Sequence, residues 1–186
     1  NKRFLKDVPM FEEMLVKNGI KLFKFYFSVS KEVQKERFES RKLDVLKQYK
    51  LSPIDNLAQK YWDQYSIRKF QMLSETNRTI APWTIVRSDN KKQARLNCMK
   101  FVLSNMDYQD KLPEEELTPA PEIIISGIDE LKHMEENLMQ PKELLTLLIE
   151  RTDLPHDAML AAMRALMGGE WTHAQIAGFL VALRMK

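Results

Sequence analysis

Short apolar runs alternate with stretches of helical periodicity over the first 112 residues. The runs 20–29 and 82–86 are rich in aromatic and branched side chains, which is typical of buried strands. Apolar residues recur at helical spacing elsewhere, which predicts helices at about 7–19, 30–41, 52–75 and 89–103. This alternation favours an α/β fold with a parallel sheet. Because two strands alone rarely make a stable sheet, we expect this part of the fold to be incomplete.

Polar residues with capping ability mark where these helices should begin. Ser30 is placed to cap the helix after the first strand, and Asp89 to cap the last helix of this region. Ser52 followed by Pro53 combines a hydroxyl cap with a proline in the first turn. Residues 42–51 have poor periodicity and are rich in lysine, so we expect a mobile basic segment there.

Beyond residue 112 the pattern changes twice. Residues 113–138 are expected to be a linker or tail: 112–122 are rich in proline and glutamate, 123–125 form a short apolar patch, and 127–139 could be a marginal polar helix or a tail. Residues 139–186 have large apolar faces at helical spacing, which predicts a small all-helical unit. The chain is therefore divided into 1–112, 113–138 and 139–186.

The helical unit carries clear start and stop signals. Asp153-Leu154-Pro155 is placed to open its second helix, and Gly168-Gly169 to end it. Thr172 and Gln175 have the spacing of a capping box at the start of the third helix. The methionines of the second helix recur every four residues and are expected to lie in the core.

Composition and cysteine usage argue against a membrane-spanning chain. Charged residues make up 30% of the sequence, and no apolar run approaches the ~18–20 residues that a spanning helix needs. The single cysteine, Cys98, cannot form an internal disulfide, so a cytoplasmic location is expected. The three histidines are scattered singly and predict no metal site.

The formal net charge of +3 hides an uneven distribution. Residues 1–112 contain 23 Lys and Arg against 13 Asp and Glu, a net charge of +10, whereas residues 113–186 contain 6 against 13, a net charge of −7. A basic region of this kind fits a polyanionic partner such as a nucleotide, a nucleic acid or polyphosphate. An ordinary solvated, lysine-rich surface explains the composition equally well.

Four cations are spaced as a phosphate-covering lid would require. Arg37 and Arg41 are four residues apart and share one face of a predicted helix. Lys47 and Lys50 follow in the basic segment. Phosphoryl transfer needs positioned positive charge, and a basic helix leading into a basic loop could close over phosphates. The alternative is an ordinary solvated helix face followed by a surface loop.

Two motif-rich stretches resemble the family-2 polyphosphate kinases. The stretch FYFSVSKEVQKERFESRKLDVLKQYKLSPIDNLAQKYWDQY, residues 25–65, is similar to the family's lid region. The stretch APWTIVRSDNKKQARLN, residues 81–97, is similar to a second block that follows it in the family. The resemblance extends from Asn1 to about Tyr108. Val45, Tyr49 and Asn90 depart from the family pattern, and Val45 removes a proline that would stiffen the lid.

The resemblance implies a P-loop kinase fold, of which residues 1–112 would be the C-terminal part. It implies phosphoryl transfer between inorganic polyphosphate and a nucleotide of the ADP/AMP or GDP/GMP class, with Mg²⁺ as cofactor. Carried over by position, the catalytic lid cations would be Arg37, Arg41, Lys47 and Lys50. Residues near the nucleotide would be Arg87, Ser88, Asp89 and Lys91. Homo-oligomeric assembly is implied for the intact family.

The phosphate-binding loop of such a kinase is not found in this sequence. No GxxxxGK[ST]-like stretch occurs in the 186 residues, nor a strand ending in an aspartate that would help to hold magnesium. We therefore expect a fragment of a polyphosphate:nucleotide phosphotransferase that is inactive alone.

Residues 139–186 resemble the N-terminal helical domain of anthranilate phosphoribosyltransferase, an enzyme of tryptophan biosynthesis. The matching blocks are 163–170, 175–176, 179–180 and 182–186, and nucleoside phosphorylases share the pattern. The resemblance implies a packing and dimer-contact role and assigns no catalytic residue. We expect two joined gene fragments, with a natural bifunctional protein as the alternative.

A third interpretation is a basic polyanion-binding module. The charge of the first 112 residues permits it, but no zinc motif, helix-turn-helix or RNA-binding signature supports nucleic acid as the partner.

Overall fold

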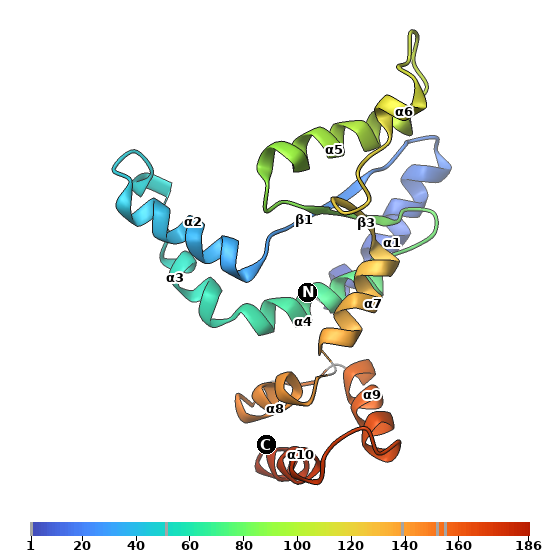
Figure 1. Cartoon of the computed structure of the whole chain (residues 1–186). Helices are drawn as coiled ribbons and strands as arrows, with labels where there is room; N and C mark the ends of the chain where they lie inside the picture. Colours follow the sequence, from blue (N-terminus) through green and yellow to red (C-terminus); the bar gives the residue numbers. More distant parts are fainter. Residues whose placement is uncertain (1, 51, 139, 152, 155) are drawn as a thin grey trace. The chain divides into compact units, whose positions relative to one another are not determined.

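The computed structural model describes residues 2–50, 52–138, 140–151, 153–154 and 156–186, and it divides into two compact units. The first unit comprises residues 1–60 and 75–130, and the second comprises 61–74 and 131–186. Figure 1 shows the elements along the chain. They are α1 (Lys2–Lys17), β1 (Lys24–Ser28), α2 (Lys31–Leu43), the 3-10 helix η1 (Gln48–Lys50), α3 (Pro53–Lys60), α4 (Trp62–Thr76), β2 (Trp83–Arg87), α5 (Lys91–Ser104), α6 (Glu114–Leu117), β3 (Ile124–Ser126), α7 (Gly127–Leu138), α8 (Pro141–Ile149), α9 (His156–Met167) and α10 (His173–Met185).

The first unit is a mixed α/β structure built on a sheet of order β1-β2-β3. β1 and β2 are parallel, as the sequence predicts, with Lys24 opposite Trp83 and Ser28 opposite Arg87. β3 is antiparallel to β2. Ile85 and Val86 of β2 are fully buried, as expected for a central strand.

The segment 113–138, interpreted from sequence as a linker or tail, contains α6, β3 and α7. Leu117 of α6 is buried, and Asn97 Oδ1 of α5 accepts a hydrogen bond from Ala120 N at 2.7 Å. The three isoleucines at 123–125 then bring the chain to the free edge of β2. The sheet has three strands rather than two because this apolar run finds unpaired backbone groups there.

The two faces of the sheet differ in chemistry. Phe25 lies on one face, where its ring meets Phe101 of α5 edge-on at 5.7 Å. Side chains alternate along a strand, so Lys24 and Tyr26 lie on the opposite face, together with Trp83 and Arg87 of β2. The first face is aromatic, whereas the second carries buried polar groups.

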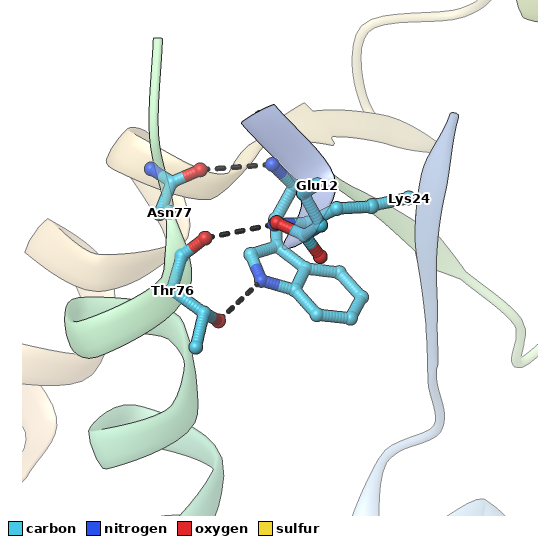
Figure 2. A network of polar contacts seen from close by, with 5 residues as sticks. Glu12, Lys24, Thr76 and Asn77 are labelled. Carbon is cyan, nitrogen blue, oxygen red and sulfur yellow. Dashed lines mark hydrogen bonds and ion pairs between the residues drawn. The ribbon is translucent and has the colours of Figure 1, made fainter. Parts of the chain in front are cut away.

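A buried ion pair anchors the start of β1 on this polar face. Lys24 Nζ donates to Glu12 Oε2 of α1 at 2.7 Å and to the Thr76 carbonyl at the end of α4 at 2.8 Å, as Figure 2 shows. The ammonium also lies 4.8 Å from the centre of the Trp83 ring. The Trp83 indole N–H donates to Thr76 Oγ1, and Asn77 Oδ1 accepts from Trp83 N. α1, β1, β2 and the end of α4 are thus joined through one network.

Several helix boundaries differ from expectation. α1 begins at Lys2 rather than at Asp7, because Leu5 and Val8 extend its inward face, and Pro9 lies inside it. The helix predicted over 52–75 is divided by a turn at Tyr61 into α3 and α4.

The second unit contains a core built from α8, α9 and α10. Leu144, Leu148, Ala162 and Phe179 are buried together with Trp171. The capping box between Thr172 and Gln175 is present, which confirms that prediction. The expected helix end also occurs, with Gly169 at φ +74°.

Two methionines of α9 are less buried than the sequence predicts. Met163 is 41% exposed and Met167 is 79% exposed, so the prediction of a methionine core stripe is wrong for both. The small side chains of Ala158 and Ala162 take the inward face of α9 instead. The predicted end of the basic segment at Leu51, the predicted start of the helical unit at Met139 and the predicted helix start at Pro155 lie outside the described residues. None of the helices within the described ranges is both long and apolar enough to cross a membrane.

Candidate functional site

The carboxyl ends of β1 and β2 meet at one edge of the sheet, and the predicted nucleotide residues lie there. Ser88 N donates to Ser28 O at 2.7 Å, which continues the parallel ladder one step past β2. The Ser88 side chain is buried and its hydroxyl donates to Val86 O at 2.9 Å. The hydroxyl is therefore committed to the chain's own backbone. Ligands of open parallel sheets bind outside this end of the strands, which makes the edge the place to look for a site.

Asp89 does not cap α5, so that prediction is wrong. The N-cap is Asn90, whose side-chain oxygen accepts from the backbone N–H groups of Lys92 and Gln93. Asp89 instead accepts the Ser30 N–H through Oδ1 at 2.8 Å. The reason is geometric, since Asp89 lies one residue before the cap and faces the start of α2. The Ser30 hydroxyl caps α2 through Val33 N at 3.4 Å, which confirms the second capping prediction.

Arg37 joins the middle of α2 to the same loop. Its Nη2 donates to the carbonyl of Ser88 at 2.7 Å and to the carbonyl of Asp89 at 2.8 Å. Together with the Asp89–Ser30 hydrogen bond, these contacts attach α2 to the loop after β2 at two points. The structure therefore brings Arg37, Ser88 and Asp89 together, as a shared site would require.

The other three lid cations have local partners instead. Arg41 Nη1 lies 3.2 Å from Asp55 Oδ2 of α3. Lys47 Nζ lies 2.7 Å from Asp44 Oδ2, and this hydrogen bond is the main reason that the pKa of Asp44 is lowered. Lys50 Nζ lies 5.4 Å from the centre of the Tyr49 ring. These cations lie around the α2–α3 connection and do not converge on Arg37 in this structure.

The remaining two predicted residues flank the loop. Lys91 is exposed at the first position of α5, where the helix N-terminus also favours anions. Arg87 ends β2, and its Nη2 donates to Glu130 Oε2 of α7 at 2.7 Å. Glu130 is 2% exposed and was not predicted from sequence. The available signal was an acidic residue in the first turn of a helix that directly follows an apolar run.

Magnesium has no preformed cage among the described residues. No group of three or more His, Cys, Asp or Glu side chains there is arranged to hold a metal ion. Mg²⁺ is usually bound through one or two carboxylates plus substrate phosphates. Asp89 is the carboxylate nearest in sequence to the strand end, and its Oδ1 already accepts the Ser30 N–H. These residues do not fit a resident magnesium site.

A surface pocket occurs elsewhere in the first unit, between α1 and the turn after α4. Its charged lining residues are Lys6, Glu13, Glu75 and Arg78, and its apolar lining includes Met10. The predicted site residues lie outside this lining.

Comparison with known proteins identifies relatives of both parts of the chain. Residues 1–114 match the family model described as Polyphosphate kinase 2, and residues 142–186 match the model described as the helical bundle domain of the glycosyl transferase family. These matches agree with both resemblances found in the sequence.

Curated relatives match the first part of the chain. The NDP-polyphosphate phosphotransferase 2 of Ruegeria pomeroyi is 46% identical over 67% of this chain and 36% of its own length. The GDP-polyphosphate phosphotransferase of Pseudomonas aeruginosa is 44% identical over 67% of this chain and 34% of its own length. The ADP-polyphosphate phosphotransferase 2 of Rhizobium meliloti is 42% identical over 75% of this chain and 45% of its own length. The chain thus spans between about a third and just under half of these relatives.

A solved structure, the Polyphosphate Kinase 2 of Arthrobacter aurescens TC1, is 32% identical to this chain, with a TM-score of 0.49, and covers 51% of this chain and 34% of that one. The family model of polyphosphate kinase 2 covers 114 of the 186 residues. The chain therefore belongs to the polyphosphate kinase 2 family.

Proposed function

We propose that this chain takes part in phosphoryl transfer between inorganic polyphosphate and nucleoside mono- or diphosphates. The names of the relatives support this, since they are phosphotransferases that use polyphosphate with NDP, GDP or ADP. The observation that carries the proposal is the double attachment of α2 to the loop after β2, through Arg37 and Asp89. This attachment brings the two motif-rich stretches of the family together at the carboxyl ends of the parallel strands, which supports the proposal.

In this proposal Arg41, Lys47 and Lys50 cover the phosphate chain, while Arg37 holds α2 in place. The Lys47–Asp44 pair is 49% and 36% exposed, and ion pairs that are exposed to solvent contribute little to stability. A polyphosphate with many negative charges can therefore displace Asp44 at little cost. Mg²⁺ would enter bound to the phosphates rather than reside in the protein. Cytoplasmic location and homo-oligomeric assembly are part of the same proposal.

Polyphosphate binding by the purified 186-residue chain tests the proposed lid. We expect binding that weakens with added salt and is stronger for polyphosphate than for duplex DNA, measured by isothermal titration calorimetry. The double variant Lys47→Ala/Lys50→Ala should bind polyphosphate about tenfold more weakly, because two charge-assisted hydrogen bonds are lost. The matched control Lys132→Ala removes an exposed lysine of α7 and should bind as the parent does. Equal affinity for duplex DNA and polyphosphate would instead favour the basic polyanion-binding module.

The same purified chain should show no turnover. The sequence contains no GxxxxGK[ST] loop to hold the transferred phosphate, so binding without catalysis is the expected result. The measurement is formation of ADP from AMP, and of ATP or GTP from the diphosphates, with polyphosphate and Mg²⁺ present. Turnover within an order of magnitude of a full-length relative would contradict this part of the proposal.

The second candidate concerns residues 142–186 alone. Their match to the glycosyl transferase helical bundle model favours a packing and dimer-contact role of the anthranilate phosphoribosyltransferase type. Leu180, Val181 and Met185 of α10 are each more than half exposed, as an unpaired contact surface would be.

A further inference from the structure

Arg87 forms an ion pair with a carboxylate that is almost fully buried. Arg87 Nη2 lies 2.7 Å from Glu130 Oε2, and Glu130 is 2% exposed whereas the Arg87 side chain is 34% exposed. A carboxylate removed from water is costly unless it is paired. The pair is therefore asymmetric, with a fixed acid on the inside and a guanidinium that still reaches solvent.

The backbone around Glu130 is fixed on β2 by several contacts. Arg87 N donates to Ile123 O at 2.8 Å, and β3 pairs with β2 and runs directly into α7. A Cβ atom at Gly127 would lie 3.0 Å from Trp83 Cβ and from the Trp83 carbonyl oxygen, so the first residue of α7 touches β2. The first turn of α7 thus forms a rigid support for the Arg87 side chain.

Two further features describe the surroundings of Glu130. The pKa of the Tyr26 phenol on β1 is raised, first by burial and second by the negative charge of Glu130. Glu130 also lies in the first turn of α7, where the helix dipole favours an anion.

The solvent-exposed part of the Arg87 guanidinium is suited to bind a phosphate. A guanidinium has five N–H donors in a planar fork that matches phosphate oxygens, and the contact with Glu130 uses one nitrogen, Nη2. Arg87 ends β2 beside Ser88, at the carboxyl edge of the parallel strands, where ligands of such sheets bind.

We propose that Glu130 is a positioning residue that holds the Arg87 guanidinium in the orientation in which it binds a phosphate of the nucleotide. The inference rests on the proposed function. It goes beyond it by assigning a role to the start of α7, which lies outside the region matched by the family model. Glu130 does not itself touch the nucleotide.

A double-mutant cycle on nucleotide binding tests this role. The dissociation constants of ADP and GDP are measured by isothermal titration calorimetry for the 186-residue chain and for Arg87→Ala, Glu130→Gln and the double variant. We expect about tenfold weaker binding for Arg87→Ala and about threefold to tenfold for Glu130→Gln. The double variant should match Arg87→Ala alone, because the carboxylate acts only through the arginine.

Controls separate positioning from folding. Urea unfolding of each variant establishes that it is folded, and Glu130→Asp, which keeps the charge one methylene further back, serves if Glu130→Gln does not fold. Glu130→Asp should weaken binding by a smaller factor than Glu130→Gln. Glu135→Ala, which removes an exposed acid further along α7, should leave the affinity for nucleotides unchanged.

Three results would overturn the inference. If Glu130→Gln, or Glu130→Asp where that variant is used, binds ADP and GDP as tightly as the parent chain, Glu130 has no positioning role. If Glu130→Gln weakens nucleotide binding by the same factor in the Arg87→Ala background as in the parent chain, Glu130 does not act through Arg87 and its effect is only structural. A chain that binds polyphosphate but neither nucleotide leaves the proposed lid standing and removes only the role of Glu130, whereas failure to bind all three ligands removes the proposed function as well.

Discussion

Replacing Glu12 with alanine is expected to lower the free energy of unfolding of the first unit by about 3–5 kcal/mol. The substitution removes the counter-ion of the Lys24 ammonium and leaves its hydrogen bond to the Thr76 carbonyl, in a place where the two side chains of the pair are 6% and 11% exposed. An ammonium kept from water without its counter-ion loses far more than the hydrogen bond itself. The measurement is urea-dependent hydrogen exchange of peptides covering 20–30 and 82–88.

A matched control lies on the same helix. Asp7→Ala removes the partner of Arg3 in a pair whose side chains are 94% and 63% exposed, so it should cost no more than about 1 kcal/mol. Similar losses from Asp7→Ala and Glu12→Ala would contradict the account of a buried anchor.

The double variant Glu12→Leu/Lys24→Met shows whether the charge or the packing matters. Removing both charges together avoids an unpaired ion, so the stability should recover by several kcal/mol relative to Glu12→Ala. A double variant as unstable as Glu12→Ala would mean that shape at this place, rather than charge pairing, determines the loss.

The local elements of this fold could be predicted because their signals are local. The strands follow from runs of aromatic and branched residues, and the starts of α2 and α10 follow from Ser30 and from the Thr172–Gln175 box. The division between α3 and α4 at Tyr61 could not be predicted, because no glycine or proline marks it in the sequence. Its neighbours Lys60 and Trp62 are both compatible with a helix.

The third strand and the charge pairs depend on contacts between distant residues. Lys24 meets a carbonyl 52 positions later, and Arg87 meets an acid 43 positions later. Lys24 lies at the start of β1 in an apolar run, and the fold buries it against Glu12. One sequence indicates which residues are charged, but not which opposite charge the fold brings to them.

The candidate site was predictable in part for the same reason. Ser88 and Asp89 follow a strand that the pattern identifies, so their place at the sheet edge could be expected. The role of Arg37 could not be predicted. Its guanidinium donates to two backbone carbonyls, and because every residue has a carbonyl, a sequence does not indicate which ones an arginine contacts. The family motif indicated the importance of this arginine without indicating what it contacts.

Phe179→Ala is expected to have the largest effect in the second unit, a loss of about 3–5 kcal/mol. Phe179 is fully buried, and the Trp171 ring meets it edge-on with 5.2 Å between ring centres. Truncation leaves a cavity between α8, α9 and α10 and removes this aromatic contact, which alone contributes about 0.5–1.5 kcal/mol. In a unit of this size, such a loss exceeds what a small core can tolerate.

The neighbouring residue supplies the control. Leu180 is 51% exposed, so Leu180→Ala should change stability by about 1 kcal/mol at most. Near-ultraviolet circular dichroism follows the packing of Trp171, and hydrogen exchange of 141–149 and 173–185 follows α8 and α10. Because the two units have separate cores, the exchange of 20–30 and 82–88 in the Phe179→Ala variant should stay at the parental rate. Faster exchange in those peptides would show that the units unfold together, and the helical unit would then be a structural part of the kinase-related unit rather than an independent neighbour.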